Sequence, residues 1–193
     1  MTIHHLSTMI NTIPIEVYSG EIVQIWDPND KRYEWKLYDT SMPKIEYITG
    51  GRKLNSCSKF PIEANDTVHS MLNVWLADMP IAFKVEATKN FGLEKYLERL
   101  IEEANVDMSF RLNTLKAVLS SAQLMIFADS SRVHNFAGFV IAVREFTETH
   151  DDVFEKTPVF VILDEGDTVG ISMVADRILE LQEGKMEELL VDL

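Results

Sequence analysis

The sequence has only one cysteine, Cys57, in 193 residues. One cysteine excludes a disulfide within the chain, and it cannot build a cysteine-based zinc site on its own. Such scarcity is typical of proteins that work in a reducing compartment. It therefore predicts a cytoplasmic location.

Long apolar runs are also missing. No stretch approaches the roughly 18 apolar residues that cross a bilayer, and residues 1–6 lack the basic start and apolar core of a signal peptide. The sequence predicts neither membrane insertion nor export by that route. With 46% hydrophobic and 25% charged residues, the composition is that of a globular protein. We expect one domain over residues 1–193, with residues 61–66 as the candidate boundary between two subdomains.

Basic side chains are scarce, and the net charge is −13. Residues 145–193, the acidic C-terminal quarter, hold 14 acidic and three basic side chains, whereas residues 1–144 hold 17 and 15. Because nucleic-acid phosphates require compensating Lys and Arg, direct binding to nucleic acid is not expected. The concentrated acidity favours a protein partner with a basic surface. The candidate contact residues are Asp151, Asp152 and Glu155.

Complete catalytic motifs are absent as well. The sequence has no phosphate-binding loop of the form G-x-x-x-x-G-K-S/T, and its five histidines do not form H-E-x-x-H. Ser130, Ser131 and His134 lie near one another in sequence, but no G-x-S-x-G elbow accompanies them. This pattern predicts a non-catalytic acidic interaction protein without a cofactor, such as an adaptor, an inhibitor or an assembly component.

Two features refine this hypothesis. An acidic face could act as a nucleic-acid mimic that occupies the DNA site of a basic enzyme. The small size and the lack of metabolic motifs suit a phage or mobile-element protein, which would act in the host cytoplasm or in the virion. A homo-oligomer is compatible with the sequence.

One segment has the features of a chemical site. The apolar run Val159–Leu163 ends in Asp164 and Glu165, and Asp167 follows. This segment resembles the Walker B element of nucleotide hydrolases, in which the first carboxylate orients magnesium and the second helps to activate water. The resemblance implies an alternative function, a divalent-metal-dependent phosphoryl or nucleotide enzyme in which these three carboxylates hold Mg or Mn. The simpler interpretation is an acidic turn in which Asp167 or Thr168 caps a helix.

Short β-like segments fill the first third of the chain, separated by turn residues. Ser19-Gly20 is expected to form a tight hairpin turn, and Asp27-Pro28-Asn29-Asp30 is a strong turn signal. Gly50-Gly51 is expected to follow the last of these N-terminal strands. The expected strands are residues 13–18, 21–26, 32–38 and 44–48.

After residue 61 the apolar spacing changes towards the period of a helix. The expected helices are residues 68–76, 93–104 with Asn90 as the cap, 109–120, and a C-terminal helix from Ile171 onwards. The expected strands are residues 81–85, 124–127, 138–146 and 158–163, with a loop at residues 147–156. Together these segments predict an α+β fold, with an N-terminal antiparallel β meander, a mixed helix and strand layer, and a C-terminal helix.

Overall fold

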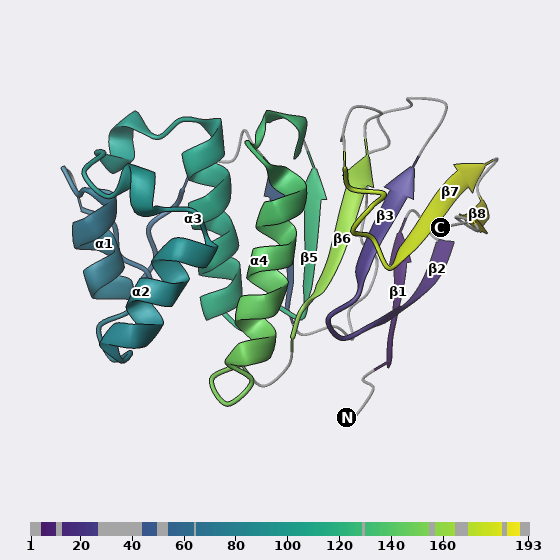
Figure 1. Cartoon of the computed structure of the whole chain (residues 1–193), viewed down its shortest axis with the longest axis horizontal. Coiled ribbons are helices and arrows are strands. Elements are labelled where there is room, and N and C mark those ends of the chain that lie inside the picture. Colours follow the sequence, from purple (N-terminus) through teal and green to yellow (C-terminus); the bar gives the residue numbers. More distant parts are fainter. Residues whose placement is uncertain are drawn as a thin grey trace.

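The structure is a computed structural model of the whole chain (Figure 1). It describes residues 5–10, 13–26, 44–49, 54–63, 65–128, 130–154, 157–164, 170–182 and 185–189. Within these residues a mixed sheet of six strands packs against helices, so the α+β class is confirmed.

The main sheet has the strand order β4-β5-β6-β3-β7-β8. Its strands are β4 (Ile45–Thr49), β5 (Leu124–Ala128), β6 (Val159–Asp164), β3 (Ile22–Trp26), β7 (Arg177–Gln182) and β8 (Lys185–Leu189). All neighbours are parallel except β7 and β8, which are antiparallel. Five strands therefore point their carboxyl ends towards one edge of the sheet, the upper edge in Figure 1.

Helices cover one face of this sheet. They are α1 (Val68–Trp75), α2 (Ile81–Asn90), α3 (Val106–Leu119) and α4 (Phe136–Thr149), with 3-10 turns η1 (Glu94–Tyr96), η2 (Ile101–Glu103) and η3 (Ser130–Arg132). Phe110 of α3 stacks on Phe127 of β5 with ring centroids 5.6 Å apart, and Phe136 of α4 meets both rings edge-on. Burial of these aromatic rings fixes α3 and α4 on the sheet.

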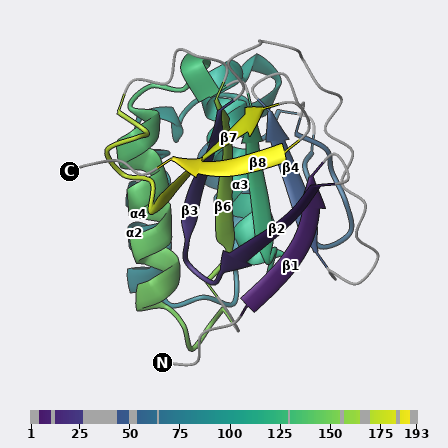
Figure 2. The ribbon, with the colours of Figure 1, turned by 90° about the vertical axis from the view of Figure 1, so that its right-hand side faces the viewer.

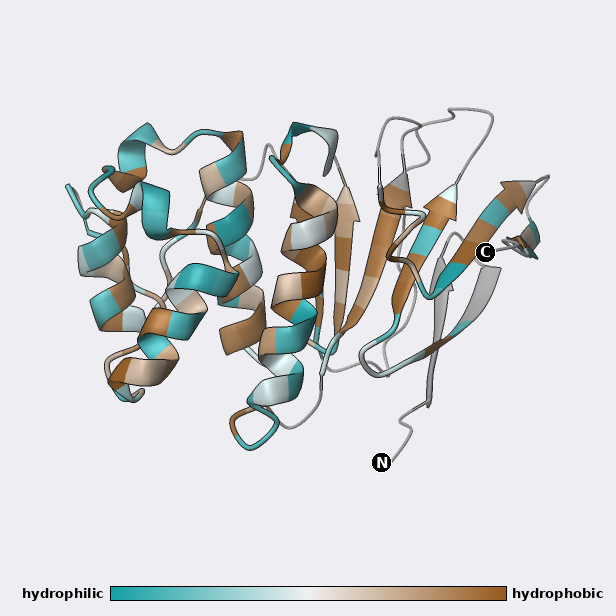
Figure 3. Cartoon of the chain, viewed as in Figure 1, coloured by the Kyte–Doolittle hydropathy of each residue, from teal (hydrophilic) through white to brown (hydrophobic). Residues whose placement is uncertain are grey.

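The opposite face of the sheet is covered by an antiparallel hairpin of β1 (His5–Ile10) and β2 (Ile13–Tyr18) (Figure 2). Val17 of β2 packs in a second apolar cluster with Val23 and Ile25 of β3. The central strands are therefore buried on both faces, and Figure 3 shows them as nearly continuous hydrophobic runs. Such runs are typical of parallel strands.

Several sequence predictions are confirmed, namely the segments that form β2, β3, β4, β5, β6, α1 and α3. The prediction of a hairpin turn at Ser19-Gly20 is wrong, because β2 and β3 belong to different sheets. The amide of Gly20 instead donates to the carbonyl of Pro158 at 3.3 Å. The N-terminal meander is therefore limited to β1 and β2. The predicted turns at residues 27–30 and 50–51 and the strand at residues 32–38 lie outside the described residues.

Two predictions between residues 81 and 104 are wrong. Residues 81–85 are mostly apolar and were expected to form a short strand, yet they begin α2, and Ile81 is 81% exposed. The predicted helix at residues 93–104 is replaced by η1 and η2. Asn90 ends α2 rather than capping a new helix, and Gly92, at φ +60°, turns the chain into a conformation that suits glycine.

Two predictions in the C-terminal third are also wrong. Residues 138–146 belong to α4 rather than to a strand, because an apolar run of this length fits a buried helix as well as a strand. The C-terminal helix is replaced by β7 and β8. Ile178, Leu179 and Leu181 are all buried, so β7 does not show the alternation that identifies a half-buried strand. None of the described helices is long and apolar enough to cross a membrane.

Candidate functional site

At β3, in the centre of the sheet, the connections between strands change direction. From β3 the chain reaches β4 at the far edge, returns through β5 and β6 to one side of β3, and then crosses to β7 on the other side. In open α/β sheets, ligands bind outside the carboxyl ends of the strands at such a switch point. We therefore expect a ligand-binding site at the carboxyl ends of β3 and β6.

Acidic residues lie in register with the end of β3. Trp26 pairs with Asp164 of β6 on one side and with Glu180 of β7 on the other. Register thus places Asp164, the first residue of the predicted metal site, at the switch point. The side chain of Asp164 and the whole of Glu165 and Asp167 lie outside the described residues, so the metal site stays a prediction. Among the residues whose side chains are described, no three His, Cys, Asp or Glu gather as metal ligands would.

Sequence reasoning missed a second acidic position at this edge. Asp129, which lies outside the described residues, directly follows β5 in the sequence. Strand β5 is apolar throughout and is the parallel neighbour of β6, with Phe127 paired to Ile162. The sequence could have identified Asp129, because an apolar strand followed by an acidic residue is the same pattern that identified Asp164.

The predicted partner-binding residues lie elsewhere. Asp151 and Asp152 are exposed in the turn after α4. This turn lies at the lower end of α4 in Figure 1, whereas β6 ends at the upper edge of the sheet. Glu155 lies outside the described residues. Among the described residues, the turn that carries Asp151 and Asp152 therefore lies at the opposite end of the sheet from the end of β6.

Part of the acidic C-terminal quarter is used inside the fold. Asp176 accepts the amide of Ile22 at 2.8 Å and pairs with Arg144 of α4 at 3.0 Å. Arg177 pairs with Glu21 at 3.2 Å and with Glu188 at 3.3 Å. These contacts join β3, β7, β8 and α4, so the charge there does not all contribute to one outward-facing acidic surface.

A buried ionic network lies in the helical layer, centred on Asp107 in the first turn of α3. Its carboxylate accepts hydrogen bonds from the Arg111 Nε at 3.0 and 3.1 Å, from the Lys95 Nζ at 3.0 Å and from the Tyr96 hydroxyl at 2.5 Å. The amide of His134 adds a further bond at 3.0 Å. One carboxylate thus connects η1, α3 and the segment before α4. Sequence reasoning missed this network.

The network should make stability depend on pH in the acid range. Burial alone would raise the pKa of Asp107, but hydrogen bonds from Arg111, Tyr96 and Lys95 outweigh it and lower the pKa from 3.8 to about 2. A carboxyl whose pKa is lower in the folded state stabilises the fold above its unfolded pKa, and this contribution is lost as the pH falls through the folded value. We expect about 2 kcal/mol of the free energy of unfolding to disappear between roughly pH 4 and 2.

Urea unfolding measured from pH 5 to 2 tests this expectation. The exposed Asp152→Asn variant should lose stability in parallel with the wild type. Asp107→Asn should start from a lower value and show a flatter decline. Equal slopes for the wild type and Asp107→Asn would contradict the assignment.

Several solved structures share the fold. An RNase-L inhibitor matches with a TM-score of 0.59 at 17% identity, over 98% of this chain and 40% of that one. The archaeal ribosome recycling factor aABCE1, in complex with the ribosomal stalk protein aP1, matches with 0.56 at 17% identity, over 96% and 38%. The ATP-binding cassette MJ0796, a dimer bound to ADP and Pi, matches with 0.54 at 12% identity, over 92% and 88%. No protein-family model and no curated protein sequence matches the chain.

These similarities correct the first functional hypothesis. At this level of identity they show the fold alone, and the chain spans less than half of the first two proteins. The solved structures that share this fold nonetheless include an ATP-binding cassette. The hypothesis of a non-catalytic acidic adaptor, inhibitor or viral assembly component is therefore wrong, together with its nucleic-acid-mimic variant and the expectation of no cofactor.

Proposed function

We propose that this chain is a divalent-metal-dependent enzyme that acts on nucleotide phosphates, with ATP as the first candidate. One observation carries the proposal: register places Asp164 beside Trp26 at the switch point of the sheet. Ligands of α/β sheets bind at this position. The solved structures that share the fold support a nucleotide as the ligand, since one of them is bound to ADP and Pi.

The residues at the end of β6 fit a metal ion by the chemistry of their donors. Mg and Mn prefer carboxylate oxygens, which Asp164, Glu165 and Asp167 supply. We propose Asp164 as the ligand that orients the metal and Glu165 as the group that accepts a proton from the attacking water. A bound divalent ion would neutralise charge on the phosphate oxygens.

The phosphate-binding part does not fit the usual pattern. No glycine occurs between Gly20 and Gly50, so β3 is not followed by a glycine-rich loop. The first residues after β3 include Asp27 and Asp30, which carry the same sign of charge as the phosphates. Because the sequence lacks a glycine-rich phosphate-binding loop, we expect weak binding, with a Kd of about 0.1–1 mM, equivalent to about 4–5.5 kcal/mol.

Replacing Asp164 by asparagine should weaken the Mg-dependent binding of ATP at least about tenfold, because the amide removes the charge that holds the metal. Phosphate release from ATP should fall by a similar or larger factor. Isothermal titration with and without Mg, followed by a phosphate-release assay, measures both quantities.

The matched control is Asp152→Asn, which removes the same charge from the opposite edge of the sheet. It should leave both measurements unchanged. If the two variants bind Mg·ATP equally well, Asp164 is not the metal ligand. If the wild type binds no Mg·ATP at about 5 mM, the proposed function fails.

We also propose a protein partner. The archaeal neighbour is seen in complex with a ribosomal stalk protein, a partner established for that protein only. Asp151, Asp152 and Glu155 stay the predicted contacts for a partner with a basic surface. Asp151 and Asp152 belong to the turn after α4, which lies at the opposite end of the sheet from the end of β6 (Figure 1). A partner bound there would leave the proposed nucleotide site open.

A further inference from the structure

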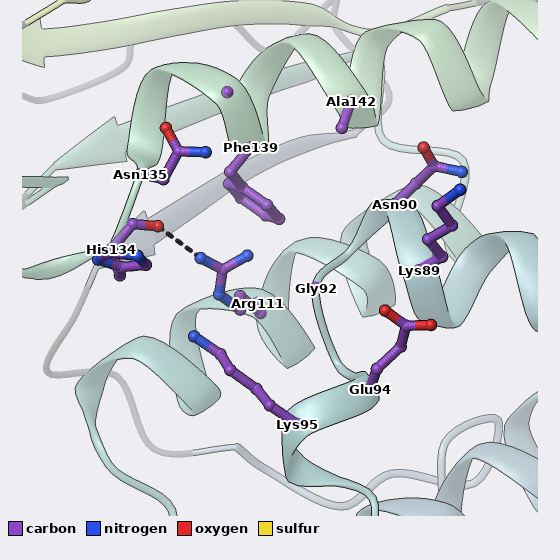
Figure 4. Close-up of a pocket in the computed structure, with 11 residues that line it drawn as sticks. Lys89, Asn90, Gly92, Glu94, Lys95, Arg111, His134, Asn135, Phe139 and Ala142 are labelled. Carbon is purple, nitrogen blue, oxygen red and sulfur yellow. Dashed lines mark hydrogen bonds between the residues drawn. The ribbon is translucent and has the colours of Figure 1, made fainter.

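A second candidate site lies in the helical layer, in a pocket of about 370 Å³ between α2, α3 and the start of α4. Figure 4 shows Arg111 at its centre, with Lys95 beside it and Lys89 across the opening. Phe139 and Ala142 provide an apolar wall. No residue of β3 or β6 lines this pocket, so it is separate from the proposed site at the ends of these two strands.

Arg111 is only 5% exposed, yet it is not fully hydrogen-bonded. Its Nε donates to Asp107, one Nη donates to the carbonyl of Phe91 at 3.3 Å, and the other donates to the carbonyl of His134 at 2.7 Å. A guanidinium has five N–H groups. Each terminal nitrogen therefore keeps one N–H without an acceptor in the described part of the chain, and buried donors of this kind normally have a partner.

The guanidinium is also held rigidly. Asp107 and the two carbonyls fix its plane, and its Cζ lies 4.7 Å from the centre of the Phe139 ring. A planar donor that is already oriented loses little entropy when it binds an oxyanion. Arg111 thus has the geometry of a binding residue as well as of a structural one.

The other charged groups favour an anion. Lys89 is exposed and has no hydrogen-bond or ion-pair partner among the described residues, while Lys95 has only Asp107 and Tyr96 nearby. Glu94 is the only acidic residue that lines the pocket, within the described chain. Asp107 offsets part of this charge, because it bonds to both Arg111 and Lys95. Three cations and two carboxylates leave an excess of one positive charge, which suits an anionic ligand.

We propose that this pocket binds the phosphate group of a small phosphorylated molecule. Arg111 donates its two remaining N–H groups to the phosphate oxygens, and Lys89 and Lys95 supply charge at the opening. Phe139 and Ala142 contact the organic part of the ligand. Arg forms the planar paired hydrogen bonds that phosphate recognition requires, and a phosphate has enough oxygens to accept from Arg111 and from the two lysines.

Inorganic phosphate is the probe for the test, titrated into the full chain at constant ionic strength and followed by amide NMR and calorimetry. We expect saturable shifts in residues that line the pocket. Lys89→Gln should raise the Kd about three- to tenfold, and Glu94→Gln should lower it by a similar factor. Both residues are exposed, so both variants should fold.

Lys84→Gln is the matched control, because it removes a lysine from the same helix that does not line this pocket. It should leave the Kd for phosphate unchanged. Asp164→Asn should also leave it unchanged, which distinguishes the pocket from the proposed metal site at the end of β6. Absence of saturable shifts up to about 20 mM phosphate overturns the proposal. Equal effects of Lys84→Gln and Lys89→Gln, with none from Glu94→Gln, also overturn it, since they would indicate non-specific attraction.

Discussion

Replacing Asp107 by asparagine is expected to lower the free energy of unfolding at pH 7 by about 3–5 kcal/mol. The change removes the charge partner of Arg111, which is 5% exposed and cannot move into water without breaking its bonds to the carbonyls of Phe91 and His134. An uncompensated buried charge is among the most destabilising defects in a protein core. Urea unfolding followed by circular dichroism measures the loss.

Lys95→Gln provides the comparison, because Lys95 contributes to the same carboxylate from a side chain that is 48% exposed. An exposed pair contributes at most about 1 kcal/mol. If Asp107→Asn lowers the free energy of unfolding no more than Lys95→Gln does, the ion pair of Asp107 and Arg111 behaves as an exposed pair rather than a buried one.

Replacing Gly92 by alanine is expected to cost about 3 kcal/mol or more. Gly92 has a φ of +60°, a conformation that L residues rarely adopt. A Cβ there would lie 2.4 Å from the Nη1 of Arg111. Arg111 cannot withdraw, because its other nitrogens are held by Asp107 and His134. The loss should be visible as a reduced urea midpoint.

Gly138→Ala is the matched control. Its Cβ would lie 2.5 Å from the Nδ2 of Asn135, but that atom is the far end of an exposed side chain that makes no capping bond. Asn135 can therefore rotate away, and alanine favours the helix at this position by up to about 1 kcal/mol. We expect a change within about 1 kcal/mol of zero. Similar losses for both variants would show that Arg111 does not confine Gly92.

The sequence predicted correctly those segments whose apolar pattern fits only one kind of secondary structure. Residues 124–127 and 158–163 are short apolar runs bounded by polar residues, and both are strands as expected. Residues 138–146 show a similar run and form a helix. Ile141 and Ala142 on the half-exposed side are also apolar, so the sequence does not show the helical period clearly. The order of strands was out of reach, since nothing near Ser19-Gly20 indicates that β3 pairs with β6 rather than with β2.

The candidate sites also differ in whether a local sequence pattern identifies them. Asp164 was found because an acid at the end of an apolar run is a local pattern. Asp107 and Arg111 were not found, because an Asp and an Arg four residues apart on a helix usually form a surface pair. Here α3 is enclosed on nearly all sides, so the pair is buried. Only the packing of η1 and α4 around α3 turns it into a network.

The position of β3 has a consequence for how the chain is made. The amide of Ile22 is bonded to Asp176, 154 residues away, and both neighbours of β3 come from the last third of the chain. On the ribosome, the nascent chain must keep β3 without its partners until β6 and β7 have emerged. Contacts between such distant residues make folding slow, and unpaired apolar strands favour aggregation while they wait. The strand order itself therefore exposes β3 to aggregation for most of the time that synthesis takes.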